Sequence, residues 1–169
     1  MPTLLRPYGL YGNRFAAAPA DLVRRAVQVL APGARTNLIA IAAPAGGRGP
    51  YRRSQLEQIL VTAYTGFAAA VAESKTMWPQ APVEIRTRFW GCGGFGGNRR
   101  AMTLLQLLAA RLAKVDRVRF YAFDDKGDAE FQRGAADLDR VIGGAGEPVA
   151  EVIARIDDLA YEWGVSDGN

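Results

Sequence analysis

The sequence predicts an α/β fold of three layers (α/β/α), in which helices cover a mostly parallel or mixed sheet. Segments with the apolar spacing of helices alternate with short strand-like runs, an order typical of parallel strand neighbours. A loop with five glycines, residues 91–97, joins a predicted strand to the next predicted helix. The chain of 169 residues is long enough for one core, so we expect a single domain over residues 1–169.

The composition excludes several kinds of site. The chain has no histidine and one cysteine, Cys92, which excludes histidine-dependent catalysis, histidine metal sites and an internal disulfide. We expect no metal and no cofactor. The formal net charge is +4, but the arginines are scattered along a chain rich in Ala, Gly and Pro, so a nucleic-acid surface is not expected. No apolar run reaches the ~20 residues that cross a bilayer, and the N-terminus lacks a signal-peptide core. We expect a cytoplasmic protein.

Three elements are predicted in the first part of the chain. Apolar spacing predicts a helix over residues 21–30. The uninterrupted apolar run at residues 37–43 predicts a buried strand. Ser54 and Glu57 match a capping box, which predicts the start of a helix over residues 54–72.

Five further elements surround the glycine loop and follow it. Alternating apolar and polar residues predict a strand with one polar face over 83–89. The region 99–114 is apolar nearly all round, which predicts a buried helix. A third strand is predicted over 117–123, and amphipathic helices are predicted over 129–141 and 149–163.

The glycine loop has the features of an anion site. Glycine lets the backbone approach a ligand closely, and the loop N–H groups and the next helix N-terminus can then face phosphate oxygens. A plain flexible connection is the alternative. The loop is not a P-loop, because no Lys-Ser or Lys-Thr pair follows it.

Several side chains near this loop have two interpretations. Phe95 and Phe123 can form an apolar wall for a sugar or a base, although Phe95 can instead plug the core. Cys92 can be a reactive thiol near a helix N-terminus, but a small buried hydrophobe is the favoured interpretation. Asn98 fits a helix N-cap. Four arginines either neutralise phosphate or lie on a solvated surface: Arg86, Arg88, Arg99 and Arg100.

Three stretches carry a family resemblance. Residues 87–98 read Thr-Arg-Phe-Trp-Gly-Cys-Gly-Gly-Phe-Gly-Gly-Asn, residues 102–110 form a Leu-rich helix, and residues 118–123 form an aromatic strand. They resemble poly(ADP-ribose) glycohydrolases, whose loop carries a Trp-Gly-Cys-Gly-x-Phe-Gly-Gly string. The resemblance covers residues 38–125 and implies a macrodomain-type fold that binds ADP-ribose or an ADP-ribosylated protein.

The resemblance also implies residue roles. Residues 91–97 would hold the diphosphate, Phe95 would contact the distal ribose and Phe123 the adenine. The expected ligand-binding residues are Trp90, Gly91, Cys92, Gly93, Gly94, Phe95, Gly96, Gly97, Asn98 and Phe123.

The chain departs from the family in its catalytic part. The family's Gly-Gly-Gly loop followed by Gln-Glu-Glu does not occur, and the fold is expected to be truncated on its N-terminal side. Glycoside hydrolysis needs a positioned carboxylic acid. The candidates are Asp21, Glu84 and Asp124, of which Asp124 stands in a predicted turn.

We therefore expect a protein that binds ADP-ribose or a related nucleotide diphosphate. One alternative is a hydrolase of ADP-ribosyl or nucleotide glycosidic bonds with a relocated carboxylate. Another is a non-catalytic interaction subunit that docks a partner through the helix over 149–163.

Overall fold

The computed structural model describes residues 16–26, 37–122, 124–144 and 146–166. Its contacts divide the chain into two compact units, residues 1–38 with 168–169, and residues 39–167. In the first unit, α2 (Ala20–Ala26) confirms the start of the helix predicted over 21–30, whose last four residues lie outside the described ranges.

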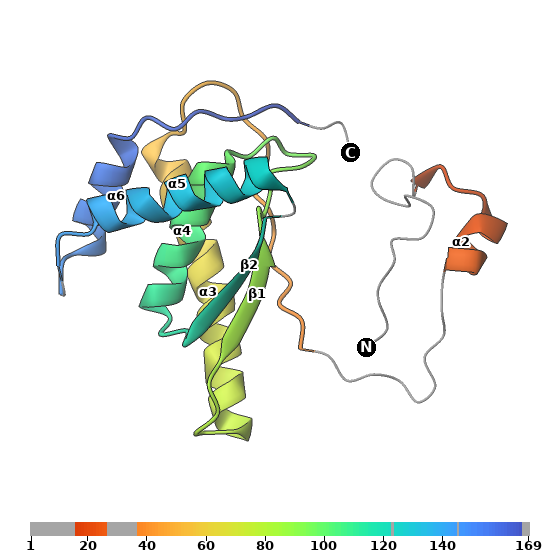
Figure 1. The fold of residues 1–169 in the computed structure, drawn as a ribbon, viewed down its shortest axis with the longest axis horizontal. Coiled ribbons are helices and arrows are strands. Elements are labelled where there is room, and N and C mark those ends of the chain that lie inside the picture. Colours follow the sequence, from red (N-terminus) through yellow and green to blue (C-terminus); the bar gives the residue numbers. More distant parts are fainter. Residues whose placement is uncertain (1–15, 27–36, 123, 145, 167–169) are drawn as a thin grey trace. The chain divides into compact units, whose positions relative to one another are not determined.

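The second unit alternates helices and strands (Figure 1). Its elements are α3 (Arg53–Met77), β1 (Glu84–Arg88), α4 (Arg99–Leu112), β2 (Arg117–Tyr121), α5 (Asp125–Val141) and α6 (Val149–Asp157). The two strands are parallel, with Glu84 opposite Arg117 and Arg88 opposite Tyr121. An α/β fold with parallel strand neighbours is thus confirmed.

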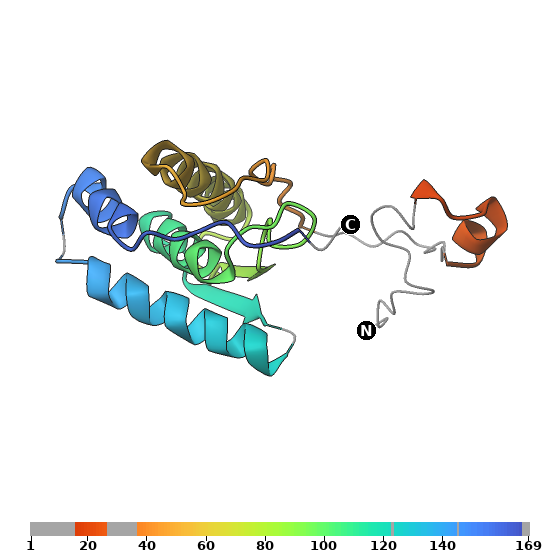
Figure 2. The same cartoon turned by 90° about the horizontal axis from the view of Figure 1, so that it is seen from above.

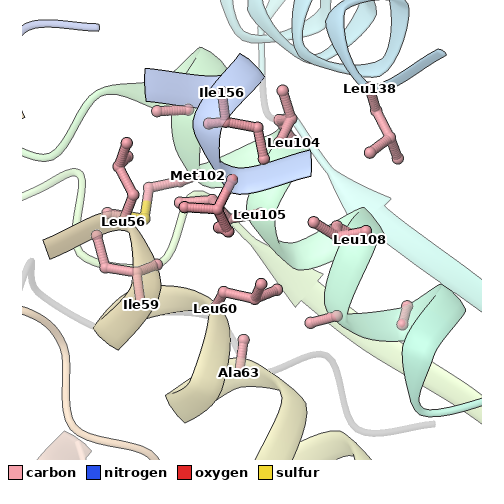
Figure 3. Close-up of a cluster of buried hydrophobic side chains, with 14 of the residues drawn as sticks. Leu56, Ile59, Leu60, Ala63, Met102, Leu104, Leu105, Leu108, Leu138 and Ile156 are labelled. Carbon is pink, nitrogen blue, oxygen red and sulfur yellow. The ribbon is translucent and has the colours of Figure 1, made fainter. Parts of the chain in front are cut away.

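The core is built around α4. This helix packs against both α3 and α5 and lies between them (Figure 2). Figure 3 shows how leucines of α4 meet apolar side chains of α3, α5 and α6. Leu104, Leu105 and Ile156 are completely buried, and each burial contributes about 1.5–3 kcal/mol. The predicted burial of this helix is confirmed.

The sheet has one apolar and one polar face, as the alternation predicts. Ile85 is buried, and Thr87 on the same face donates from Oγ1 to Gln106 Oε1 of α4 at 2.6 Å. On the opposite face, Glu84 accepts hydrogen bonds from Arg86 at 2.9 Å and from Arg119 at 3.2 Å. The apolar face therefore points towards the helices.

The strand predicted over 37–43 is wrong. These residues have no regular secondary structure, and Leu38 is 85% exposed. The next alternate side chains lie against α3 instead: a Cβ on Gly66 would be 3.1 Å from Cγ2 of Ile39 and 2.8 Å from Cγ2 of Ile41. Only these alternate side chains pack on the helix, a contact that the sequence pattern does not distinguish from burial in a sheet.

The capping box predicted from Ser54 and Glu57 is also wrong. Helix α3 begins one residue earlier, and the Arg52 N–H donates to Gln55 Oε1 at 2.9 Å. Glu57 instead accepts a hydrogen bond from Arg53 Nε at 3.0 Å. Two overlapping pairs of residues are spaced to cap this helix, and the earlier pair, Arg52 and Gln55, does so.

Two further helix boundaries differ from prediction. Asp124 does not begin a free turn but caps α5, because its Oδ1 accepts from the Gly127 N–H at 2.6 Å. An aspartate makes the same bond in turns and in N-caps. Helix α6 ends at Asp157 rather than continuing to Trp163, and the chain leaves it through Ala160, whose φ is 49°.

Candidate functional site

The glycine loop connects the carboxyl end of β1 to the first turn of α4. Its own backbone closes it twice: the Gly96 N–H donates to the Gly93 carbonyl at 2.9 Å, and the Gly97 N–H donates to the Gly91 carbonyl at 2.9 Å. Ligands of parallel sheets bind at this edge. The loop is therefore compact and lies at the expected edge of the sheet.

The fold requires glycine at three loop positions. Gly91 and Gly96 have φ values of 74° and 63°, in the left-handed region that side chains disfavour. A Cβ on Gly97 would stand 2.8 Å from the Gly91 carbonyl oxygen. These constraints preserve one loop shape.

Three consecutive N–H groups of the loop make no hydrogen bond to the described residues. No acceptor within the described ranges takes the N–H of Gly93, Gly94 or Phe95. The first two N–H groups of α4, from Arg99 and Arg100, are likewise without an acceptor there, as is usual at a helix start. Backbone donors grouped beside a helix N-terminus are suited to a phosphate group.

Asn98 caps α4, as the sequence predicts. Its Oδ1 accepts from the Ala101 N–H at 3.0 Å. It also joins the loop to two distant segments, since its N–H donates to Tyr51 Oη at 3.0 Å and its Nδ2 donates to the Glu162 carbonyl at 2.8 Å. Asn98 thus has a structural role whether or not a ligand is bound.

The two loop aromatics are placed differently. Phe95 is 50% exposed, so it does not plug the core and is accessible to a ligand. Trp90 is partly buried and packs against the core. Its Nε1 is buried without a hydrogen-bond partner among the described residues.

The environment of Cys92 disfavours a reactive thiolate. Burial raises its pKa to about 12, although the positive charge of Arg99 acts in the opposite direction. Its Sγ lies 3.7 Å from the Trp90 carbonyl oxygen. Because the nucleophile is the thiolate, the buried-hydrophobe interpretation agrees with the structure.

Glu84 stands at the end of β1 remote from the loop. The Cα of Glu84 is about 13 Å from the Cα of Arg88, at roughly 3.3 Å per residue. Hydrogen bonds from Arg119 and then Arg86 hold the Glu84 pKa below its usual range. A carboxylate kept ionised at this end of the strand is poorly suited to donate a proton to a ligand in the loop.

The other two acid candidates lie in different units. Asp124 follows β2, and its Oδ1 is 4.0 Å from Nη1 of Arg99, the first residue of α4. It therefore stands at the same edge of the sheet as the loop. Asp21 belongs to the first unit and pairs with Arg25 at 3.2 Å. Phe123, the predicted adenine contact, lies outside the described residues.

Residues 161–166, called here the C-terminal segment, contact the loop in a way that the sequence did not predict. The Trp163 ring stacks on Tyr51 at 4.2 Å between centroids, and the Trp163 N–H donates to the Gly49 carbonyl at 2.9 Å. Farther along, Ser166 Oγ donates to the Gly94 carbonyl at 2.7 Å. Because the sequence predicts a helix through residue 163, it gives no sign of this contact with the loop.

A second segment approaches the loop before α3. A Cβ on Gly46 would lie 2.9 Å from the Phe95 carbonyl oxygen, and one on Gly91 would lie 3.2 Å from Cδ of Pro44. The Gly/Pro composition of residues 44–47 is the sequence signal for this close approach. This composition predicts a connecting segment, but it does not show that the segment contacts the glycine loop.

A buried carboxylate, Asp137, fixes the surroundings of the loop. It accepts hydrogen bonds from Arg100 in the first turn of α4, from Tyr161 Oη at 2.6 Å and from Arg140 at 3.0 Å. Burial alone would raise the Asp137 pKa, but the bonds from Arg100 and Tyr161 outweigh it and hold the pKa below its usual range. This network joins α4, α5 and the C-terminal segment.

None of the helices in the described ranges combines the length and apolarity needed to cross a membrane. No group of three or more His, Cys, Asp or Glu side chains there could hold a metal ion.

Comparison with protein families matches residues 8–130 to the family described as poly(ADP-ribose) glycohydrolase, Macro domain fold. The chain belongs to this family. The poly(ADP-ribose) glycohydrolase match contains β1, the glycine loop, α4 and β2, and it ends inside α5. The resemblance predicted from the sequence is confirmed, while α6 and the C-terminal segment lie outside the matched residues.

Proposed function

We propose that this chain binds ADP-ribose or a related nucleotide diphosphate through residues 91–97. The observation that carries the proposal is the set of three consecutive N–H groups, from Gly93 to Phe95, that no described residue accepts from and that precede the N-terminus of α4. Membership of the poly(ADP-ribose) glycohydrolase family supports the choice of ligand.

The proposed roles of the loop residues rest on the site geometry together with the family resemblance, and that of Phe123 rests on the resemblance alone. The N–H groups of the loop bind diphosphate oxygens, the exposed Phe95 packs on the distal ribose, and Arg99 supplies positive charge at the start of α4. Trp90, Cys92 and Asn98 support the loop shape, and Phe123 contacts the adenine. We also propose that residues 1–169 form one three-layer macrodomain-type domain.

Isothermal titration calorimetry with ADP-ribose tests the proposal. Gly97→Ala should abolish measurable binding, because the new Cβ would stand 2.8 Å from the Gly91 carbonyl oxygen and 3.3 Å from Cys92 Sγ. Gly144→Ala is the matched control, since nothing lies within 4 Å of its Cβ position. Absence of binding by the unaltered chain at millimolar ADP-ribose would refute the proposal.

A hydrolase with a relocated carboxylate is the second candidate. Asp124 favours it, being at the same sheet edge as the loop and 62% exposed. Glycohydrolase assays on poly(ADP-ribose) and on ADP-ribosylated protein test this activity. Turnover that is lost in Asp124→Asn, with ADP-ribose affinity unchanged, would support it, and no turnover by the unaltered chain would exclude it.

The interaction-subunit alternative has less support. Val152, Ile153 and Ile156 form the apolar face of α6, and all three are buried in the core of the second unit. Burial of these three side chains argues against docking through them, although Val149 at the start of the helix is 38% exposed.

A further inference from the structure

The orientation of one peptide group decides which way a loop N–H points. Gly94 and Phe95 occupy the middle of a β-turn closed by the bond from Gly96 N–H to the Gly93 carbonyl. The carbonyl and the N–H of a trans peptide point in opposite directions. Because the Gly94 carbonyl accepts the Ser166 hydroxyl at 2.7 Å, the Phe95 N–H points away from the C-terminal segment.

The backbone of the turn favours the same orientation. Neither Gly94 nor Phe95 has a left-handed φ, which excludes turn types that need one at either position. Rotating the middle peptide by half a turn would give a type II turn, with φ near +80° at its third residue. Phe95 occupies that position, and a phenylalanine avoids this conformation.

The bond from Ser166 belongs to a close contact between two backbones. A Cβ on Gly96 would lie 2.8 Å from the Ser166 nitrogen and 3.0 Å from the Gly164 carbonyl oxygen. Gly96 is buried as a result. The C-terminal segment is itself held by the stacking of Trp163 on Tyr51, so the hydroxyl is presented to the turn by an anchored backbone.

We propose that Ser166 is a positioning residue for phosphate recognition. Its hydroxyl holds the Gly94–Phe95 peptide so that the Phe95 N–H remains directed at the phosphate of a bound nucleotide diphosphate. The inference rests on the proposed function and extends it to a residue beyond the family match, which ends at residue 130.

The test compares Ser166→Ala with Ser166→Thr, which retains the hydroxyl. Calorimetry with ADP-ribose should show about two- to tenfold weaker binding for Ser166→Ala, the range expected for one hydrogen bond, and restored binding for Ser166→Thr. Thr76→Ala is the matched control, because it removes a hydroxyl-to-carbonyl bond of 2.9 Å near the last turn of α3. It should leave the affinity unchanged.

A second measurement separates positioning from general destabilisation. The amide resonance of Phe95 should shift on titration with inorganic pyrophosphate in the unaltered chain and in Ser166→Thr, and should shift less in Ser166→Ala. Unaltered affinity and an unaltered Phe95 shift in Ser166→Ala would overturn the inference and leave the proposed function standing. Weak binding by Ser166→Thr, or by Thr76→Ala, would also overturn it. Failure of the unaltered chain to bind ADP-ribose would remove both.

Discussion

Replacing Asp137 with asparagine should destabilise the protein by about 2–4 kcal/mol, since hydrogen bonds to a charged group contribute about 1.5–3 kcal/mol each. Asp137 is 3% exposed, and its Oδ2 accepts a hydrogen bond from the buried Tyr161 hydroxyl at 2.6 Å. An asparagine has the same shape but turns an NH₂ group towards at least one of the donors. The Arg100 side chain is 38% exposed, so its guanidinium can regain water and the loss stays below the sum of the individual bonds.

Urea unfolding at neutral pH, extrapolated linearly to water, measures this loss. Asp139→Asn is the control on the same helix: Asp139 is 71% exposed and pairs with Arg111 at 2.9 Å, and such surface pairs contribute about 0–1 kcal/mol. A loss below about 1 kcal/mol for Asp137→Asn would refute this account of the network.

The same network predicts a pH dependence. The folded-state pKa of Asp137 is lowered, so its stabilisation is fully present above the unfolded value of about 3.9. It is lost as the pH falls through the lower folded value. The difference in stability between the unaltered chain and Asp137→Asn should therefore be constant near neutral pH and shrink below about pH 4. A difference that grew on acidification would contradict the assigned sign.

Three other substitutions or treatments test separate parts of the structure. Cys92, with its pKa raised to about 12 by burial, should react slowly with iodoacetamide at pH 8 in the folded protein and rapidly in urea; equal rates would contradict its burial. Gly127→Ala should lower the unfolding midpoint sharply, because its Cβ would overlap the Ala122 carbonyl oxygen, whereas Gly144→Ala should not; similar midpoints would show that the start of α5 relaxes freely. Tyr51→Phe should cost about 1–3 kcal/mol in urea unfolding, since the Asn98 N–H loses its acceptor; a neutral effect would mean that water replaces the hydroxyl.

Local patterns in the sequence predict the central part of the fold well. The alternation in β1 places Ile85 inside and Glu84 outside because side chains on a strand point to opposite faces. Asn98 is recognisable as a cap because its bond to Ala101 spans three residues. The glycine loop can also be predicted from local sequence, because its shape depends on its own backbone angles.

Contacts between distant segments are not visible in such patterns. Asp137 accepts its hydrogen bond from Tyr161 only because α5 and the C-terminal segment pack together. From the sequence alone, an aspartate on a helix is usually predicted to be exposed to solvent. Ser166 is likewise remote in sequence from the Gly94 carbonyl that it contacts. Trp163 fits the apolar spacing of the preceding helix, so the sequence predicts that the helix continues to it. The chain in fact turns at Ala160, which has a left-handed φ although it is not the glycine that usually marks such a turn.

The contact between the C-terminal segment and the residues preceding α3 has a practical consequence for shortening the gene. A chain cut at residue 130, where the family match ends, would divide α5 and remove Tyr161 and Trp163. The Tyr51 ring would then lose its stacking partner, and the Tyr51 backbone N–H would lose its hydrogen-bond acceptor, the Tyr161 carbonyl. Expression trials that follow the family boundary should therefore yield insoluble or protease-sensitive material, whereas deletions after residue 166 should spare these contacts.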